Sequence, residues 1–366
     1  MILYIWKYAD DTFTRVAAID YASSIIWVQR FQAVGEFEIY IRASEELMDI
    51  FSGDVFITRD DSEATMYVES VDLKTDSENG DYITITGRSA ELMLSWRIIQ
   101  QAFYSGASTT AEIIIRDLLT TWIVQPSPIL ISDNYIPFLS LEAAHGWDDK
   151  TTHQFTGKNL SDVIYELCIT YNYGLRFAWT GSGFEIQLYK GTDRSYGQSE
   201  NTYVVFSPKF DNLGNTQYVN STANYANSAI IGGEGEGVAR KFAVVYPQGI
   251  TGFYRRTIYV DGRNTSSDTD SGTLTNKQYM DMLKAQGKDA IAEHKVTQTF
   301  SGEIISTNSY VYGKDYFLGD KVSVENDYGI TGSATILEIT EVEDETGYRL
   351  IPTLSEWAIT EEEVST

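Results

Sequence analysis

Two stretches near opposite ends of the chain share one order of features. They are "SGDVFITRDDSEATMYVESVDL", from Ser52, and "LGDKVSVENDYGITGSATILEITEVE", from Leu318. Each opens with Gly-Asp, continues as a short alternating run, crosses a polar turn to Ala-Thr and then reaches a hairpin turn. The residues that mark the turns are Gly53, Asp54, Asn79, Gly80, Gly319, Asp320 and Gly347. Because glycine takes positive φ without steric cost, both stretches are predicted to be antiparallel β units of the same design.

The repeat predicts that segments 53–88 and 319–354 form equivalent strands. The alternative is that two unrelated β meanders share common dipeptides by chance, since the match needs a gap of a few residues. A single duplication excludes a solenoid, which needs three or more stacked repeats.

Composition excludes several classes of protein. The chain has 366 residues with 43% hydrophobic and 13% aromatic content, which indicates a globular protein of two to four domains. Its 27 Lys and Arg face 52 Asp and Glu, and a formal charge of -25 repels nucleic acid and anionic lipid. Cys168 is the single cysteine, so the fold has no intrachain disulfide. With no signal peptide and no apolar run near the ~20 residues of a membrane span, we expect a protein made in a cytoplasm, without a membrane anchor.

The pattern along the chain predicts a mainly β fold with an α+β middle. Residues 1–102 read as a β-barrel-like unit, 103–200 as an α/β domain, 201–300 as a β domain with a helix over 276–296, and 301–366 as a second β-barrel-like unit that strands from 201–260 could complete. Capping residues mark the helix starts at Thr109-Thr110, Asn159 and Thr275. In the second helix, Leu160, Val163, Ile164, Leu167, Cys168 and Tyr171 fall on one face and predict a buried stripe.

The histidines offer a weak metal site. His145 and His153 bracket Asp148 and Asp149 in "HGWDDKTTH", but this spacing matches no pattern in which two imidazoles converge. We therefore expect loop histidines.

Other motifs are incomplete. Asp268 and Asp270 resemble the start of a calcium loop, yet Tyr279 stands where a bidentate glutamate is needed. "GGEGEG" from Gly232 lacks the Lys and Ser or Thr of a phosphate loop and predicts a bulged or kinked strand connection. Cys168 lies on an apolar helix face, and no acid pair is singled out for glycoside hydrolysis. We expect no catalytic residue, no cofactor and no metal.

Several stretches taken together resemble a known family. They are "IIWVQRFQAVGEFEIYI", "ITGRSAELMLSWRII", "LYKGTDRSYGQ", "VVFSPKFDNLGN", "NYANSAIIGGEGEG" and "LGDKVSVENDYGI". In order, from about residue 20 to 356, they are similar to the Gp-type tail-hub proteins of long-tailed siphophages and prophages, the tail-associated or baseplate-hub family. The resemblance implies a four-domain hub whose first and last domains are related β-barrels, assembled as a homotrimer on the tail axis. It names no catalytic residue in this region.

The resemblance also implies partners and a location. These are a distal tail protein ring, tape-measure and tail-tip or receptor-binding proteins, and DNA only in transit through the tail tip of the virion. Some relatives carry a C-terminal cell-wall hydrolase or host-binding module; this chain stops at Thr366, soon after the second repeat, so we expect no enzyme activity.

Two barrels in each of three subunits give six, so we expect an adaptor between a sixfold tube and a threefold tip, with an acidic DNA channel. The alternatives are a virion-associated cell-wall or glycan hydrolase, and the hub of a contractile injection or secretion spike. The sequence leaves open the host, the receptor, the interface residues and whether free subunits trimerise.

Overall fold

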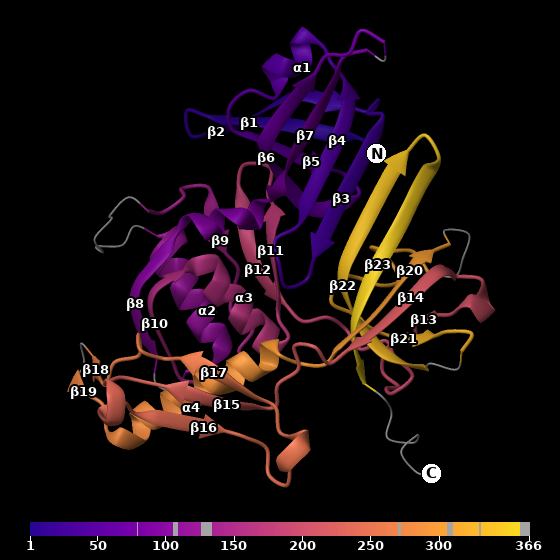
Figure 1. The fold of residues 1–366 in the computed structure, drawn as a ribbon. Coiled ribbons are helices and arrows are strands. Elements are labelled where there is room, and N and C mark those ends of the chain that lie inside the picture. The colour runs from indigo at the N-terminus through magenta and orange to yellow at the C-terminus, as the bar shows by residue number, and fades with distance from the viewer. Residues whose placement is uncertain are drawn as a thin grey trace.

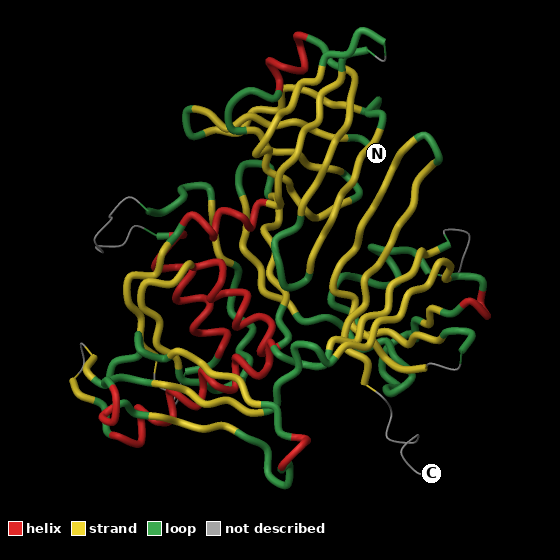
Figure 2. The backbone as a smooth tube through the Cα atoms, in the orientation of Figure 1, coloured by secondary structure: helices red, strands yellow, loops and turns green. Residues whose placement is uncertain are grey.

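The computed structural model describes residues 1–78, 80–104, 109–125, 134–269, 272–305, 310–328 and 331–358. Figure 1 shows a β unit from the N-terminus at one end of the molecule, a helical middle beside it and the C-terminal strands on the other side. Figure 2, in the same orientation, shows that strands dominate and that the longer helices lie on one side of the molecule, below the N-terminal strands. The protein is thus mainly β with an α+β middle, as predicted.

Strands from both ends of the chain form one sheet of 13 strands, in the order β14-β20-β23-β22-β3-β4-β7-β6-β5-β1-β2, with β21 beside β22 and β13 beside β21. The N-terminal strands are β1 (Leu3–Ala9), β2 (Thr12–Ile19), β3 (Ser24–Arg30), β4 (Glu36–Arg42), β5 (Val55–Arg59), β6 (Ser62–Lys74) and β7 (Tyr82–Ser89). The others are β13 (Val205–Phe206), β14 (Leu213–Ser221), β20 (Thr297–Ile304), β21 (Lys321–Glu325), β22 (Thr331–Asp344) and β23 (Gly347–Ala358).

Alternating sequence explains how these strands bury one face. In β4, Phe37, Ile39 and Ile41 are buried, and Glu38 and Tyr40 between them are exposed. The short helix α1 (Glu45–Ile50) follows β4, starts at the side-chain cap Ser44 and adds Leu47 to the same hydrophobic core.

Each end of the chain contains the same arrangement of five strands. Along the sheet the N-terminal set runs β3-β4-β7-β6-β5, and the C-terminal set runs β14-β20-β23-β22-β21. Chain order matches as well, and every neighbouring pair in both sets is antiparallel. The duplication therefore extends beyond the three strands that the sequence predicted. We call the two sets the N unit and the C unit.

A β-bulge supports this equivalence. Where β6 pairs with β7, the register shifts between Val68 and Ser70, so Glu69 is the extra residue. Where β22 pairs with β23, it shifts between Ile336 and Glu338, which makes Leu337 the extra residue. A bulge is a specific local device, and its occurrence at the same point of two long strands indicates a common design.

The dipeptides that suggested the repeat are not structurally equivalent. When the two long strands are matched at their bulges, Ala334 corresponds to Met66 and Ala64 is displaced by two residues. Gly-Asp is displaced by one residue on the same basis. The two units also differ in register, since the pairing of β5 with β6 is irregular between Ile57 and Arg59 whereas β21 pairs regularly with β22. The prediction of a repeat is thus confirmed by strand topology, whereas its residue-by-residue alignment was wrong.

The two related β units are open sheets. Within the described ranges neither forms the closed barrel that we predicted, and the N-terminal strands β1–β7 do not close on themselves through a pairing of β3 with β2. Instead β3 pairs with β22 of the C unit, and β2 pairs only with β1.

The middle of the chain surrounds a hydrophobic core that also includes Phe56 of β5. Its helices are α2 (Ala111–Leu119), continued by a π turn over Thr120–Val124, and α3 (Leu160–Tyr171). Its strands are β8 (Ile98–Tyr104), β9 (Leu139–Leu141), β10 (His153–Asn159), β11 (Gly174–Trp179) and β12 (Phe184–Tyr189). The predicted caps are confirmed, with Thr110 and Asn159 accepting backbone N–H bonds at the helix starts. The predicted stripe on α3 is buried from Leu160 to Cys168.

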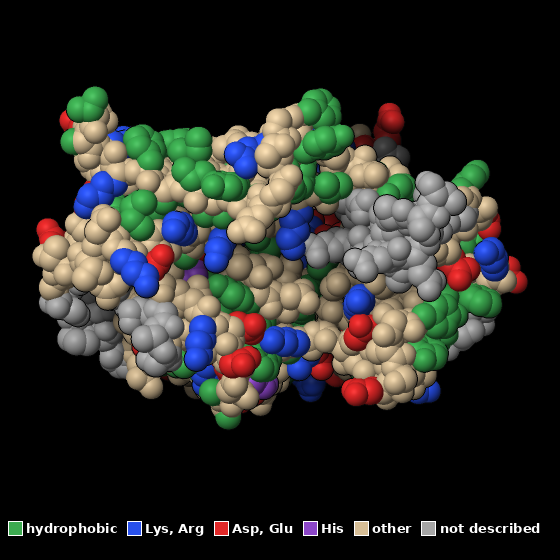
Figure 3. Space-filling model, turned by 90° about the horizontal axis from the view of Figure 1, so that it is seen from below, with side chains coloured by type: hydrophobic (Ala, Val, Ile, Leu, Met, Phe, Trp, Pro, Cys, Tyr) green, Lys and Arg blue, Asp and Glu red, His purple; other side chains and the backbone are tan. Residues whose placement is uncertain are grey.

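A small unit is inserted between β14 and β20. It contains β15 (Ser228–Gly232), β16 (Phe242–Val245), β17 (Thr257–Asp261) and α4 (Asn276–Glu293), with a short hairpin of β18 (Asp268–Thr269) and β19 (Gly272–Thr273). The helix begins at Thr275, whose capping box with Gln278 confirms the prediction. One face of the sheet packs on α4, and the other exposes Ile230, Phe242, Val244 and Tyr259. Figure 3 looks onto this end of the molecule and shows hydrophobic side chains gathered along one edge, with Lys and Arg among them.

Residues 201–300 divide between two sheets. β13, β14 and β20 pair within the large sheet, whereas β15, β16 and β17 form a separate sheet. The idea that strands from 201–260 complete the second β unit thus applies to β13 and β14. The boundaries of the four domains remain predictions.

The segment after β12 passes very close to the C unit. A Cβ on Gly191 would lie 1.7 Å from the carbonyl oxygen of Gly319, which is backbone and cannot rotate away. We therefore expect Gly191→Ala to lower the free energy of unfolding by about 1–3 kcal/mol, measured by guanidinium denaturation. The matched control is Gly197→Ala, whose Cβ would have its nearest neighbour at 3.6 Å. Equal effects of the two substitutions would contradict the close contact.

Candidate functional site

The N unit and the C unit meet where β3 pairs with β22. Six residue pairs join the two strands, from Arg30 opposite Glu338 to Ile25 opposite Glu343. The Phe31 N–H continues the ladder by donating to the Leu337 carbonyl at 2.8 Å. This junction is the candidate functional site, because it determines how two copies of one design are held within a subunit.

A buried ion pair crosses the junction. Arg59, at the end of β5, and Glu341, on β22, have side chains 0% and 5% exposed, and Arg59 Nη2 donates to Glu341 Oε2 at 2.9 Å. Glu341 also accepts from Gln29 at 3.3 Å and from the Tyr348 hydroxyl at 2.8 Å. The Arg59 guanidinium lies 5.1 Å from the centre of a Trp27 ring. Both oxygens of the Glu341 carboxylate thus accept hydrogen bonds, and the donors come from β5, β3 and β23.

The electrostatics favour the charged pair. Burial by itself would lower the pKa of Arg59, but hydrogen bonds and attraction from Asp61 and Glu341 raise it above its usual value. Burial likewise acts to raise the pKa of Asp61, and the hydrogen bond and charge of Arg59 lower it overall. Desolvating two charges is expensive, so the pair is a weak source of net stability and a strong penalty against any arrangement that separates it.

A second set of polar contacts surrounds the junction. Arg30 donates to Glu338 at 2.6 Å, to Glu36 at 2.7 Å and to the Val34 carbonyl at 2.9 Å, so it links β3, β4 and β22. At the other end of the ladder, the Met1 ammonium contacts Glu343.

The middle of the chain is tied to the same junction through Asp320. This buried carboxylate accepts from the Thr192 N–H at 2.7 Å, from Arg194 Nε at 2.7 Å and from the Phe317 N–H at 3.0 Å. Gly319 lies against the ring of Phe31, so close that a Cβ would be 2.5 Å from a ring carbon. The segment after β12, the turn before β21 and the end of β3 are therefore in close contact here.

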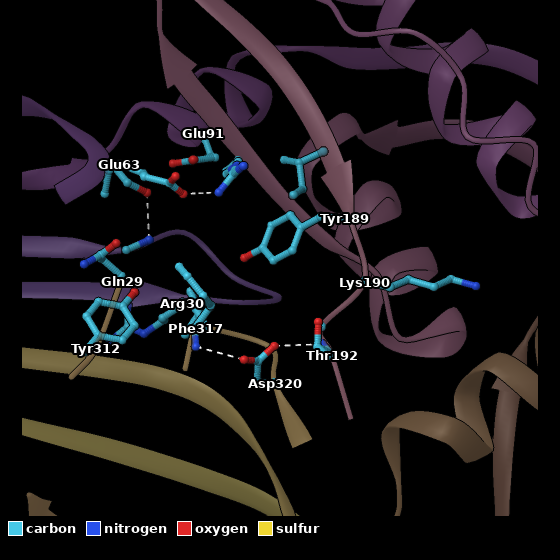
Figure 4. A pocket seen from close by; sticks show the side chains of 17 residues that line it. Gln29, Arg30, Glu63, Glu91, Tyr189, Lys190, Thr192, Tyr312, Phe317 and Asp320 are labelled. Carbon is cyan, nitrogen blue, oxygen red and sulfur yellow. Dashed lines mark hydrogen bonds and ion pairs between the residues drawn. The ribbon is translucent and has the colours of Figure 1, made fainter. Parts of the chain in front are cut away.

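A cavity of about 300 Å³ lies beside this point. Figure 4 shows that Tyr189 projects toward it, whereas Lys190 points away. Two of its charged groups already have charged partners: Arg176 contacts Glu63, and Asp320 binds Arg194 as well as the Thr192 N–H. Glu91 at its margin is buried, accepts from the Phe177 N–H at 2.8 Å, and has its pKa raised by that burial. The lining thus comes from the N unit, the middle of the chain and the C-terminal part of the chain.

The predicted turn residues lie at strand ends. Gly53, Gly80, Gly319 and Gly347 all have positive φ, at 82°, 89°, 90° and 113°. Asp54 accepts from the Tyr67 hydroxyl at 2.8 Å, which ties the start of β5 to β6. Asn79 lies outside the described residues. Of the set, only Gly319 and Asp320 belong to the junction.

The histidines do not converge. His145 stacks on Trp147 and its Nε2 lies 2.8 Å from the Leu188 carbonyl oxygen, while the Glu112 carboxylate holds the backbone of residues 145–147. Asp149 instead accepts from the Tyr173 hydroxyl at 2.5 Å and from Lys190 at 3.3 Å. Within the described ranges no group of three or more His, Cys, Asp or Glu could hold a metal ion.

The other motifs have structural surroundings. Tyr279, the twelfth position of the supposed calcium loop, is buried and donates to the Thr265 carbonyl at 3.1 Å, and Asp270 lies outside the described residues. Glu234 of "GGEGEG" accepts from Lys241 and Ser267. Burial raises the pKa of the Cys168 thiol, which disfavours the thiolate. Among the helices that the structure describes, none combines the length and apolar character of a membrane span.

Sequence reasoning missed Arg59 and Glu341. A charged residue at an inward position of an alternating strand would have indicated a buried ion pair. In β22, however, the bulge at Leu337 shifts the alternation of inward and outward residues by one. Counted without the bulge, Glu341 falls on the outward face.

Comparison with known proteins identifies the family. The family model described as "Siphovirus ReqiPepy6 Gp37-like protein" matches residues 2–354. No curated protein matches the chain. Among solved structures, the tail protein from Neisseria meningitidis MC58 has a TM-score of 0.55 at 13% identity, covering 97% of this chain and 96% of its own. The 43 kDa tail protein of prophage MuSo2 from Shewanella oneidensis has 0.54 at 13%, covering 97% and 98%. Prophage tail protein gp18 from Listeria monocytogenes has 0.51 at 14%, covering 97% and 94%.

The fold is therefore that of prophage tail proteins over nearly the whole length. The chain belongs to the Siphovirus ReqiPepy6 Gp37-like family. It is a structural component of a phage or prophage tail and is virion-associated, as the resemblance in the sequence implied.

Breaking the buried ion pair should be costly. We expect Glu341→Leu to lower the free energy of unfolding by about 3–5 kcal/mol, because Arg59 loses its buried partner. The double variant Arg59→Met/Glu341→Leu should recover most of that loss. The control is Arg263→Met, which breaks an exposed pair whose side chains are 67% and 44% exposed and should cost under about 1 kcal/mol. A double variant as unstable as the single one would contradict the interpretation.

A second buried pair predicts a pH dependence. His153 Nδ1 lies 3.4 Å from Asp289 Oδ2; burial lowers the pKa of His153 to about 4 and raises that of Asp289 to about 8. The folded state keeps the Asp289 proton after the unfolded chain has lost it, so this group reduces stability as pH rises toward 8. His153 affects stability only below its ordinary pKa of 6.5. There the unfolded chain takes up a proton that the buried imidazole does not, so stability falls as pH falls.

Asp289→Asn should therefore flatten the stability profile between pH 6.5 and 8 by about 1 kcal/mol, measured by denaturation at each pH. Asp281→Asn, on the exposed face of the same helix, is the control and should leave the profile unchanged. A wild-type slope that persists in Asp289→Asn would show that another group is responsible.

Proposed function

We propose that the chain is the trimeric tail hub that joins the sixfold tail tube or distal tail ring to the threefold tail tip. The observation that carries this proposal is the duplicated five-strand unit. Three subunits with two units each present six units of one topology, since three times two is six. Such a ring offers matching contacts to a sixfold partner while its other domains keep threefold symmetry.

The rigid junction supports the same role. An adaptor works only if its two units keep a fixed spacing, and the β3–β22 ladder with its buried ion pair fixes both distance and register. The insertion between β14 and β20 and the middle of the chain extend away from the shared sheet, toward the remaining partners: tape-measure and tail-tip or receptor-binding proteins.

The charge of the chain supports a passage for DNA. A channel must let DNA pass without retaining it, and every basic contact with phosphate adds affinity. With a formal charge of -25, the ring surface that faces the bore is proposed to be acidic, so that DNA is a partner only in transit.

The copy number in assembled particles tests the proposal. Quantitative mass spectrometry of purified tails that carry this chain should find three copies for every six copies of the distal ring protein. Six copies of this chain per ring would contradict the trimeric adaptor. A monomer in free solution is compatible with the proposal, because part of the contact can come from the partner ring.

A further inference from the structure

The long strand of the C unit has an edge shared by two neighbours. On the side away from β23, β22 pairs with β21 over residues 331–335 and then with β3 over residues 338–343. The bulge at Leu337 lies between these two segments. The outer half of this edge thus receives the first strand of the other unit.

The equivalent strand β6 has the same edge, and among the described strands only half of it is paired. β5 pairs with β6 between Ser62 and Tyr67, and within the described residues no strand pairs with this edge beyond Val68. The outer half, residues 69–74, contains the exposed Leu73 and ends at Lys74. By the equivalence of the two units, it corresponds to the segment of β22 that binds β3.

The equivalent of β3 is β14, and it also has an open edge. β14 is the terminal strand of the large sheet: it pairs with β20, and among the described strands none pairs with its other side. Its segment 217–221 pairs regularly with β20, as β3 pairs with β4. The junction within the chain joins β22 to β3. Their equivalents, β6 in the N unit and β14 in the C unit, have no such partner among the described strands.

We infer that residues 69–74 of β6 in one subunit pair, antiparallel, with residues 217–221 of β14 in the next subunit, repeating the β3–β22 junction between chains. This inference rests on the proposed trimer. When the two units are matched at their bulges and strand pairs, the register of the β3–β22 junction predicts the register between β14 and β6. Trp27 opposite Glu341 becomes Tyr218 opposite Leu73, and Val28 opposite Thr340 becomes Val219 opposite Asp72.

Side-chain exposure agrees with this register. Glu341 and Val28 are 3% and 5% exposed at the junction within the chain, whereas their equivalents Leu73 and Val219 are 45% and 39% exposed at the open edges. Pairing would bring Leu73 against the Tyr218 ring as an apolar cross-strand contact. It would also cover two strand edges with which no described strand pairs, and exposed edges of this kind favour aggregation.

The contact is head to tail. One subunit offers β6 and the next offers β14, so the same contact repeats around a ring until it closes. In a trimer three such contacts alternate with three β3–β22 junctions, and six similar junctions result. This gives the proposed adaptor a physical basis for its approximate sixfold symmetry.

Disulfide trapping tests the register. In the double variant Asp72→Cys/Val219→Cys both replaced side chains are exposed, and directly opposite residues in an antiparallel pair bring their Cα atoms to about 4.5–5.5 Å, within disulfide range. Within one subunit β6 and β14 are seven strand positions apart in the sheet, about 30 Å, so a bond must join two chains. Cys168 is buried and should not compete.

Mild oxidation of assembled tails should give covalent dimers and trimers on non-reducing gels, at least about tenfold more than Leu73→Cys/Val219→Cys, which is one residue out of register and on opposite faces. Val28→Cys/Thr340→Cys, at the equivalent junction, should give an intrachain bond only. Hydrogen exchange on unmodified protein is the second measurement: amides of 69–74 and 217–221 should become protected on assembly.

Three copies per tip without the interchain bond, or without protection of both segments, would overturn the inference and leave the adaptor intact. Six copies per ring would instead overturn the adaptor. Cross-linking by the out-of-register pair to the same extent would show a mobile contact and also contradict the inferred ladder.

Discussion

The pairing of β3 with β22, closed by the buried contact between Arg59 and Glu341, holds both ends of the chain in one sheet. Without this ladder the two related β units would lie in separate sheets, connected through the middle of the chain. Backbone hydrogen bonds supply cohesion, and the ion pair supplies register, since a slip by one residue would leave a charge buried without its partner. Asp320 and Gly319 then fix the middle of the chain against the same point.

Local signals in the sequence were sufficient for much of the fold. The caps at Thr110, Asn159 and Thr275 mark real helix starts, and the apolar stripe of α3 is buried where its spacing places it. The repeat was recognised from its turns, although Gly-Asp and Ala-Thr proved not to be equivalent positions. Such dipeptides recur because turns need particular backbone angles, so they indicate the kind of element better than its register.

The remainder depends on long-range pairing, which local patterns do not encode. The equivalence of β3–β4 with β14–β20 is hidden because residues 222–296 separate the second pair. Closed barrels were predicted because alternating strands are equally compatible with open and closed sheets; the choice is made by the partner that β3 finds. Likewise, Glu341 appears outward until the bulge at Leu337 is counted.

The central claim is that one chain carries two equivalent units, fixed side by side, which three chains arrange around an axis. The most direct measurement is a reconstruction, by electron cryomicroscopy, of an assembled tail tip at a resolution that separates strands. The account predicts three chains per ring, with N and C units alternating six times and strand continuity at every junction. A ring of six chains, or chains that contact the tube through one unit only, would contradict it.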